Sequence, residues 1–581
     1  MSDAAWSSAQ AGSASLDTSA DASAGSAARV LAVEKAAAEK DRAARKVVFA
    51  TTLAGMLEWY DFAVYGFMAT EIGNTFFSGT ERQRLMGAYA VFAAAFIARP
   101  LGGLWFGHVG DSEDGPASSE KKVATSRGAA LEQSIVIMAV PTLLLAILPG
   151  TSTIGVFAPL LLCFVRATQG LSVGGQLVGS IVLTAEEAPL ESRHCYTALT
   201  FAGANAGSLV GAVVATFLHA VFGRAAMRRG AWRLAFAFGF LLSLVAYLLQ
   251  RQLRTSTDSE AHATNSNGRD VSNATPRNSQ DDAADAPLPD GARQDGAKQS
   301  PLRAVLATPR GRLHVAAVAL VYGVHTTGFY LTFLFLPSFY VEFLRVDAPV
   351  AFSLSVLSLL GLISGAPLVG KWADSQQPRS CDGCVDDDAS QKMRLKSILY
   401  VARALVIAPP LCFWFAQRAA LQTGAGRVCL LALAAAPLVL LQCLLDGVLC
   451  TWMVGLFPPR GRYSAMALGV NLATAVFGGV APLCATALAA AAGPGFRWAA
   501  ALYFTGVALA SLVGVKIARD VSEAENARVT FPLRRASPRS TSSARFAPLH
   551  ADDAPTVELT ALSKPVRRLS EDDGYDDVAL V

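Results

Sequence analysis

Long apolar runs, separated by short polar stretches, form the main pattern along the chain. They reach the roughly 20 residues that a helix needs to cross the hydrocarbon core of a membrane. Strands are not expected, because the runs are continuous rather than short and alternating. The pattern predicts an all-α integral membrane protein with twelve transmembrane helices. We place these helices at residues 47–68, 85–107, 129–149, 154–185, 196–222, 231–250, 312–340, 350–372, 396–417, 427–455, 463–490 and 497–517.

The runs gather in two blocks of similar size, residues 47–250 and 312–517. Charged residues make up 16% of the chain, against roughly a quarter in soluble proteins. They are also segregated, since about 11% of the residues in the blocks are charged, against about 28% elsewhere. We therefore expect a six-helix half in each block. A flexible linker at 251–311 joins the halves, and disordered tails at 1–46 and 518–581 flank them.

The topology follows from the even number of spans, which places both termini on one side of the membrane. Basic residues at the ends of the linker, such as Arg251 and Arg312, indicate that this side is the cytosol. Arg224, Arg228 and Arg233 run against this rule, because they fall in a loop that the topology places outside. We expect the plasma membrane rather than an organelle membrane.

Three short motifs of the first block recur in the second, at offsets of 263, 269 and 266 positions. Matches in order at nearly one offset indicate an internal repeat. Parallel six-helix repeats are a transporter architecture with the substrate site between the halves. The matching segments are Gly107–Asp111 with Gly370–Asp374, Pro189–Arg193 with Pro458–Arg462, and Gly203–Asn205 with Gly469–Asn471.

Four longer motifs stand in order along residues 47–517. They read Glu58–Trp–Tyr–Asp61–Phe–Ala–Val–Tyr65, Arg99–Pro–Leu–Gly–Gly, Arg166–Ala–Thr–Gln169–Gly and Phe457–Pro–Pro–Arg–Gly–Arg462. With them the chain resembles the major facilitator superfamily, and within it the metabolite:proton symporters that include bacterial proline/betaine, α-ketoglutarate, citrate and shikimate transporters. The resemblance implies the major facilitator fold, with twelve transmembrane helices in two six-helix repeats.

The chain departs from this family's pattern at several positions. The loops after Asp111 and Asp374 do not carry the family's basic continuation. Gln176 and Gly455 stand where the family has glutamates. The resemblance implies that charges at the loop ends gate the two halves, and the candidates for this role are Asp111, Arg193, Asp374 and Arg462.

Charged side chains within the spans cost several kcal/mol unless they are paired or hydrated, so each one is a functional candidate. Glu58 and Asp61 lie three residues apart on one helix face, about halfway along the first span. A carboxyl pair of this kind suits a symporter, which must bind a proton on one side and release it on the other. The alternative is a pair that arginine neutralises permanently.

Arg99 and Arg166 lie well inside their spans. An arginine can hold a carboxylate through two parallel hydrogen bonds, which suits carboxylate or zwitterionic substrates. The alternative is a structural ion pair with Glu58 or Asp61. The resemblance links Arg166 and Gln169 to proton transfer. We hypothesise that Arg166 pairs with Asp61 when the site is empty and with substrate when it is loaded, because that exchange would couple the two events.

The second half offers fewer charged candidates. Asp446 is the only acid deep in one of its spans, and it could face a substrate cavity. His325 could titrate, although a histidine with a backbone partner is the more common case. Asn205 and Asn471 could mirror each other across the cavity or only bridge helices. Aromatic residues could surround a methylated cation such as betaine or only fill the packing, and those considered are Tyr60, Tyr65, Tyr330, Trp452 and Phe477.

These residues favour a proton-coupled symporter of a small organic carboxylate or a zwitterionic osmolyte, working by alternating access. Two alternatives stay open. One is a transport-inactive nutrient sensor, which the rewritten loops and Gln176 motivate, and the other is an uncoupled facilitator. The sequence has no Gly-x4-Gly-Lys-Ser/Thr loop, which argues against a primary pump.

The expected partners are the substrate, protons and the lipid bilayer. A net charge of +4 over this length gives no reason to expect nucleic acid. Kinases are candidate partners of the tails, at Ser537 and Ser570. We expect no enzyme activity, no cofactor and no metal, since Cys381 and Cys384 have no further ligands near them in the sequence.

Overall fold

The computed structural model describes residues 41, 42, 45, 48, 52, 55–112, 138–172, 175–245, 248, 301–379, 385–458 and 461–530. The expectations for the tails up to residue 40 and from residue 531, for the linker at 251–300, and for Cys381 and Cys384 fall outside these residues. Every contact discussed below lies within the compact unit Met1–Asn526.

The described part of the first block is almost entirely helical. Its first helix covers residues 55–67 and leads through Met68 into α2. The further helices are α2 (Ala69–Phe76), α3 (Glu81–Ser112), Met138–Ile147, α5 (Thr151–Ile154), α6 (Phe157–Ser172), α7 (Gln176–Glu187), the short η1 (Leu190–Ser192), α8 (Arg193–Ala226), η2 (Met227–Ala231) and Arg233–Val245.

The second block is helical in the same way. Its helices are α10 (Pro301–Ala307), α11 (Pro309–Phe329), η4 (Tyr330–Phe335), α12 (Leu336–Ser338), η5 (Phe339–Phe343), α13 (Ala348–Ser375), α14 (Asp387–Ala419), α15 (Gly424–Gly455), α16 (Arg462–Ala473), η6 (Thr474–Gly478), α17 (Ala481–Ala491), η7 (Pro494–Ala501) and α18 (Leu502–Thr530). Helix α10 and the start of α11 lie in the stretch predicted as linker. Helix α18 continues into the stretch predicted as tail.

Eight helices of the described residues are long and apolar enough to cross a membrane. Three shorter apolar helices, Met138–Ile147, Phe157–Leu171 and Arg233–Val245, coincide with predicted spans. The described residues contain no strand beyond one isolated bridge between Arg379 and Val385. The prediction of an all-α membrane fold is confirmed.

Two predicted spans differ in detail from the observed helices. The run at 154–185 is divided into α6 and α7, with a turn at Gly175 between them. The run at 312–340 continues beyond α11 through π-helical turns as far as Phe343. Another π-helical turn, η6, continues α16. Such turns interrupt the regular ladder and are frequent at functional sites.

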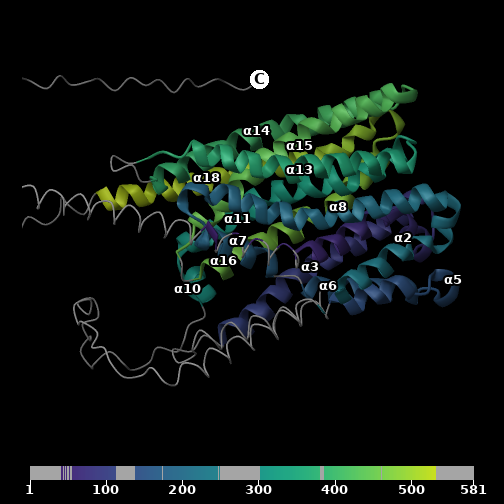
Figure 1. Cartoon of the computed structure of the whole chain (residues 1–581), viewed down its shortest axis with the longest axis horizontal. Coiled ribbons are helices and arrows are strands. Elements are labelled where there is room, and N and C mark those ends of the chain that lie inside the picture. Colours follow the sequence, from purple (N-terminus) through teal and green to yellow (C-terminus); the bar gives the residue numbers. More distant parts are fainter. Residues whose placement is uncertain are drawn as a thin grey trace, which may run out of the picture. The chain divides into compact units, whose positions relative to one another are not determined.

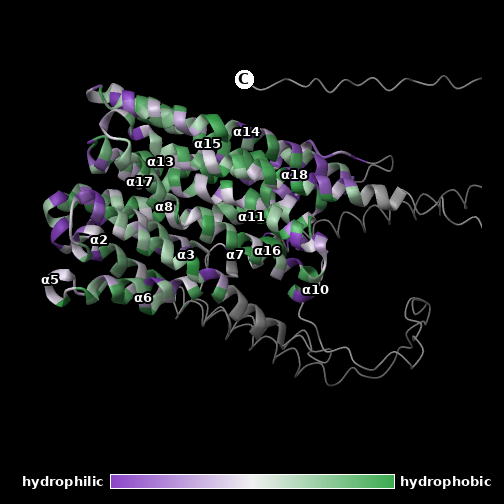
Figure 2. Ribbon diagram, turned by 180° about the vertical axis from the view of Figure 1, so that it is seen from behind, coloured by the Kyte–Doolittle hydropathy of each residue, from purple (hydrophilic) through white to green (hydrophobic). Residues whose placement is uncertain are grey.

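The helices of the unit Met1–Asn526 run side by side along a common direction (Figure 1). Hydrophobic residues cover their middle portions and hydrophilic ones gather towards their ends (Figure 2). Large apolar side chains such as Leu368, Ile407 and Leu433 remain more than half exposed, as expected for a surface that faces lipid. Helix α8 of the first block packs along α13 of the second, which brings the two blocks together.

Candidate functional site

A small cavity lies between the two blocks, and residues of both line its wall. Its open volume of about 10 Å³ is close to the space that a single water molecule requires. A molecule larger than water can therefore enter only if the surrounding helices move. The lining residues are Glu58, Trp59, Arg99, Leu177, Val178, Tyr322, Thr326, Val470, Asn471 and Thr474.

Glu58 and Arg99 form an ion pair in the wall of this cavity. Arg99 Nη2 lies 3.5 Å from Glu58 Oε1, and both side chains are buried. Within the described residues, neither carboxylate oxygen of Glu58 accepts a hydrogen bond. A buried acceptor without a donor costs about 1–3 kcal/mol. This pair is therefore held loosely, in contrast to a well-bonded structural salt bridge.

Aromatic rings fix the position of the Arg99 guanidinium. Its Cζ lies 4.4 Å from the ring centroid of Phe62 and 4.5 Å from that of Phe96. Trp59, which also lines the cavity, stacks on Tyr330 at a centroid distance of 6.4 Å. Cation–π contacts of this kind hold a guanidinium without using its N–H donors in the plane, so the donors stay available for a carboxylate.

Asp61 belongs to a second polar cluster, one helical turn beyond Glu58. Gln169 Nε2 donates hydrogen bonds to Asp61 Oδ2 and, at 3.1 Å, to Thr142 Oγ1. Gln169 Oε1 accepts a 2.5 Å hydrogen bond from Arg166 Nη1. Arg166 Nη1 lies 4.0 Å from Asp61 Oδ2. The amide of Gln169 thus bridges the acid and the arginine, all three of which are buried.

The two clusters share one aromatic ring. The Cζ atom of Arg166 lies 4.7 Å from the ring centroid of Phe62, which Arg99 also contacts, and 4.3 Å from that of Tyr65. Nη2 of Arg166 and Oδ1 of Asp61 have no hydrogen-bond partner among the described residues. Phe62 thus packs against both guanidiniums and connects the two clusters.

The second block holds a buried polar cluster of its own. His325 Nδ1 lies 2.8 Å from Asp446 Oδ1, and Gln442 Nε2 donates to the same oxygen at 3.0 Å. All three residues are at most 2% exposed. Asp446 is buried within α15, a helix long and apolar enough to cross a membrane, but it does not line the central cavity.

The remaining candidates for substrate binding lie at different distances from the cavity. The Tyr60 hydroxyl donates to the carbonyl of Ala235 at 2.7 Å, and the Tyr65 hydroxyl donates to that of Ala88 at 3.0 Å. Both phenols are thus engaged within the first block. Asn471 lines the cavity, whereas Asn205, Tyr330 and Phe477 are not among its lining residues.

At one end of the bundle, Asp374 binds the first turn of α8. Its carboxylate accepts hydrogen bonds from the backbone N–H groups of His194, at 3.0 Å, and Cys195, at 2.9 Å. His194 Nδ1 lies 2.7 Å from Asp374 Oδ1, and Arg394 Nε donates to His194 Nε2 at 3.0 Å. An acid of the second block therefore caps a helix of the first. Asp374 lies in the last turn of α13, next to the loop that follows this helix.

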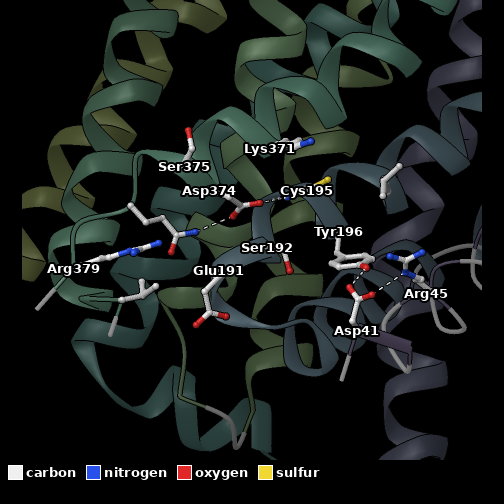
Figure 3. A pocket seen from close by; sticks show the side chains of 13 residues that line it. Asp41, Arg45, Glu191, Ser192, Cys195, Tyr196, Lys371, Asp374, Ser375 and Arg379 are labelled. Atoms are coloured by element: carbon white, nitrogen blue, oxygen red, sulfur yellow. Dashed lines mark hydrogen bonds and ion pairs between the residues drawn. The ribbon is translucent and has the colours of Figure 1, made fainter. Parts of the chain in front are cut away.

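Asp374 also lines an open pocket of about 610 Å³ at this end (Figure 3). Tyr196 lies beside Asp41 and Arg45 in this view and donates a hydrogen bond to Asp41, which Arg45 Nε also contacts at 2.9 Å. The pocket therefore lies where the segment before the first span, helix α8 and helix α13 meet.

The other predicted gating residues form a second link between the blocks. Arg462 Nη1 at the start of α16 lies 2.7 Å from Glu186 Oε1 at the end of α7. The Tyr463 hydroxyl donates to the carbonyl of Gly175 at 3.3 Å. Arg193 is half-buried at the start of α8. Asp111 lies in the last turn of α3, but the structure does not describe its side chain.

Sequence reasoning missed several residues of the site. Gln442 stands four positions before Asp446, a spacing that places two side chains on one helix face, so this signal was present. Thr142 and Phe62 offered no signal, because a threonine and a phenylalanine are ordinary residues of a membrane span. His194 and Arg394 are 200 positions apart, and only the fold brings them together.

Comparisons with known proteins agree on the family. The proline/betaine transporter of Escherichia coli (strain K12) is 28% identical over 436 residues, which cover 75% of this chain and 76% of that protein. A putative proline/betaine transporter of Staphylococcus aureus (strain COL) is 35% identical over 219 residues, 37% of this chain and 44% of that protein. These relatives are transporters rather than enzymes.

The fold has solved counterparts. The crystal structure of a D-xylose-proton symporter matches with a TM-score of 0.53 at 18% identity, covering 80% of this chain and 96% of that one. The model of the Major Facilitator Superfamily matches residues 47–419. The chain therefore belongs to the Major Facilitator Superfamily, as the resemblance in its sequence predicted, and is a multi-pass membrane transport protein.

Proposed function

We propose that this chain is a proton-coupled symporter of a small zwitterion such as proline or betaine, working by alternating access. The Glu58–Arg99 pair is the observation that carries the proposal. It places one negative and one positive group in the wall of the same cavity between the blocks. A zwitterion offers its carboxylate to Arg99 and its cationic nitrogen to Glu58, so each buried charge exchanges one partner for another.

The same pair disfavours the other substrate class that the sequence suggests. A di- or tricarboxylate would bring a net negative charge towards Glu58, and the repulsion would be strong at a buried site. A zwitterion adds no net charge. The rings of Trp59 and Tyr330 beside the cavity also suit a cationic nitrogen. The names of the curated relatives, which are proline/betaine transporters, support this class.

Asp61 is the proposed site of the coupled proton. A proton on this carboxylate removes the charge that holds Arg166 through Gln169. Arg166 is then free to shift, and its contact with Phe62 transmits the shift to Arg99. Release of the proton restores the first arrangement. Proton binding and substrate binding are thereby linked through a chain of direct contacts.

Opening to one side requires contacts between the blocks to break. At the end that carries Asp374, these contacts are the cap on α8 and the ion pair between Arg462 and Glu186. At the other end, Thr70 Oγ1 donates to Glu342 Oε1 at 3.2 Å. The small central cavity has contacts of this kind on both sides, as alternating access demands of a closed intermediate.

Uptake by purified protein in liposomes tests the proposal. Labelled proline, betaine, α-ketoglutarate and citrate are offered separately, with and without an inward proton gradient. We expect proline or betaine to accumulate above equilibrium, and a protonophore to abolish the accumulation. Accumulation of citrate or α-ketoglutarate alone would exclude the zwitterion class. No accumulation of any compound would favour the sensor, and uptake indifferent to the gradient would favour the facilitator.

Two variants relate the transport to the proposed site. Glu58→Gln removes the negative group from the cavity and should abolish accumulation of the zwitterion. Asp388→Asn is the matched control, because Asp388 is an exposed acid that pairs with Lys392 on the outside of α14. Equal loss in both variants would contradict a specific role of Glu58.

A further inference from the structure

The cluster of His325, Gln442 and Asp446 has no role in the mechanism proposed above. It is buried, and it combines two titratable groups with an amide that lies near both: Gln442 Nε2 is 2.8 Å from His325 Nδ1 and 3.0 Å from Asp446 Oδ1. Asp446 Oδ2 has no hydrogen-bond partner within the described residues. Groups of this kind are costly inside a membrane protein, so a purely structural role explains them poorly.

The cluster mirrors the one around Asp61. His325 follows Asp61 by 264 positions, within the range of the offsets that relate the two blocks. Each cluster joins the first predicted span of its block to the fourth, by way of a glutamine. The acid and the base have exchanged places. Asp61 faces Arg166 in the first block, whereas His325 faces Asp446 in the second.

One residue connects this cluster to the central cavity. Tyr322 lines the cavity together with Glu58 and Arg99, and its ring centroid lies 4.8 Å from that of His325. From the first block, the ring of Phe201 on α8 meets the imidazole edge-on at 5.1 Å. The cluster is thus one side chain away from the proposed substrate and in contact with the opposite block, so its charge can respond to both.

Among the residues that the structure describes, few titratable groups face the cluster. On α11 and α15 they are the phenol of Tyr322 and the thiols of Cys443 and Cys450, all of which are uncharged at neutral pH. Helix α8 contributes the uncharged ring of Phe201, and α13 contributes the carbonyl of Gly361 beside Cys443. Beyond Tyr322, the charge of Arg99 on α3 acts on this phenol. The charge of the cluster is therefore set by its own histidine and aspartate.

We propose that the His325–Asp446 pair is a second proton-binding site, so that each block binds one proton of the transport cycle. With a neutral imidazole and an ionised carboxylate, the pair carries one negative charge. One added proton, on the imidazole or on Asp446 Oδ2, makes it neutral. This inference rests on the proposed function and specifies it further, because it sets the proton:substrate ratio at two.

The ratio can be measured on the wild-type protein. Liposomes hold a tenfold outward gradient of labelled proline at equal pH, and potassium with valinomycin sets the membrane potential. For a substrate without net charge, net proline flux stops at a potential of about 30 mV, negative inside, for two protons and about 59 mV for one. We expect about 30 mV. A value near 59 mV would overturn the second site and leave the symport intact, whereas the absence of any proline flux would overturn both.

Variants locate the second proton. His325→Gln and Asp446→Asn should each move the reversal potential to the one-proton value. Asp446→Glu keeps the acid and should keep the two-proton value. His314→Gln is the matched control, since His314 is another buried histidine of α11 but packs on Phe457. An unchanged ratio in folded, active His325→Gln and Asp446→Asn protein would overturn the assignment. If these variants do not fold, the wild-type reversal potential still decides between one proton and two.

Discussion

Arg166 and Asp61 face each other at 4.0 Å, and the amide of Gln169 bonds to both of them at once. A direct bidentate salt bridge would hold the two charges more firmly. The bridged arrangement lets the arginine leave the acid while the amide still satisfies one carboxylate oxygen. An interaction of this moderate strength suits a pair of charges that must separate once in every transport cycle.

Gln169→Leu should weaken both stability and coupling. The change removes the donor to Asp61 and the acceptor from Arg166 in a fully buried place. Each unsatisfied group costs about 1–3 kcal/mol, so the melting temperature in detergent should fall. Accumulation of substrate driven by the proton gradient should fall more than the exchange of labelled for unlabelled substrate at equal concentrations. Thr142→Val is the control, because it removes only one acceptor of the amide. Equal loss of accumulation and exchange would contradict the role in coupling.

Arg99→Lys should weaken substrate binding while the protein still folds. A lysine keeps the charge but loses the planar fork that pairs with a carboxylate and packs between Phe62 and Phe96. We expect the dissociation constant of the substrate to rise at least about tenfold, which corresponds to roughly 1.4 kcal/mol. Isothermal titration calorimetry measures this dissociation constant. Arg418→Lys alters an exposed arginine above Trp414 and should leave binding unchanged. A normal affinity of Arg99→Lys would contradict the assignment.

Asp374→Ala should loosen the start of α8. The substitution removes the acceptors of the His194 and Cys195 N–H groups, and the loss of a helix cap costs about 0.5–2 kcal/mol. Hydrogen exchange of this turn should become roughly two- to thirtyfold faster. Asp388→Ala is the control, because Asp388 lies on the surface in the first turn of α14. It should not change the hydrogen exchange at the start of α8. Unchanged exchange in Asp374→Ala would show that the cap does not hold the two blocks together.

Gly370→Ala should separate α13 from α8. A Cβ atom at this position would lie 2.8 Å from the carbonyl oxygen of His194 and 3.0 Å from the Cα of Cys195. Both are backbone atoms, so the helices must move apart, at a cost of about 1–3 kcal/mol to the closed arrangement. Spin labels on the two helices should report a longer distance. Gly426→Ala, which has open space around it, is the control. An unchanged distance would contradict the close approach.

The sequence predicted which residues matter better than how they pair. Charged residues are so rare in the spans that Glu58, Asp61, Arg99 and Arg166 could be singled out without a structure, and all four are buried between helices. The choice of partners depends on helix rotation and tilt, for which the spacing of residues carries no information. Glu58 therefore could not be assigned to Arg99 in advance.

Contacts between residues of different blocks were still harder to predict than contacts within a block. The repeat indicated that Asp374 corresponds to Asp111, and Arg193 to Arg462, but not that Asp374 would cap α8 beside His194. For Tyr60 and Tyr65, the sequence instead suggested a role in the cavity that their contacts do not support. Both stand in the motif of the first span, and yet their hydroxyls bond to neighbouring helices of the same block because the helix turns them away from the cavity.

Substrate-driven proton movement in Asp61→Asn protein tests the coupling most directly. Liposomes that contain a pH-sensitive dye receive external proline, and the internal pH is followed together with the exchange of labelled for unlabelled proline. We expect wild-type protein to acidify the interior. Asp61→Asn should still exchange proline but acidify the interior clearly less, because only the second proposed site, His325–Asp446, can still carry a proton. Acidification of wild-type magnitude in Asp61→Asn would show that the coupled proton is not carried at Asp61.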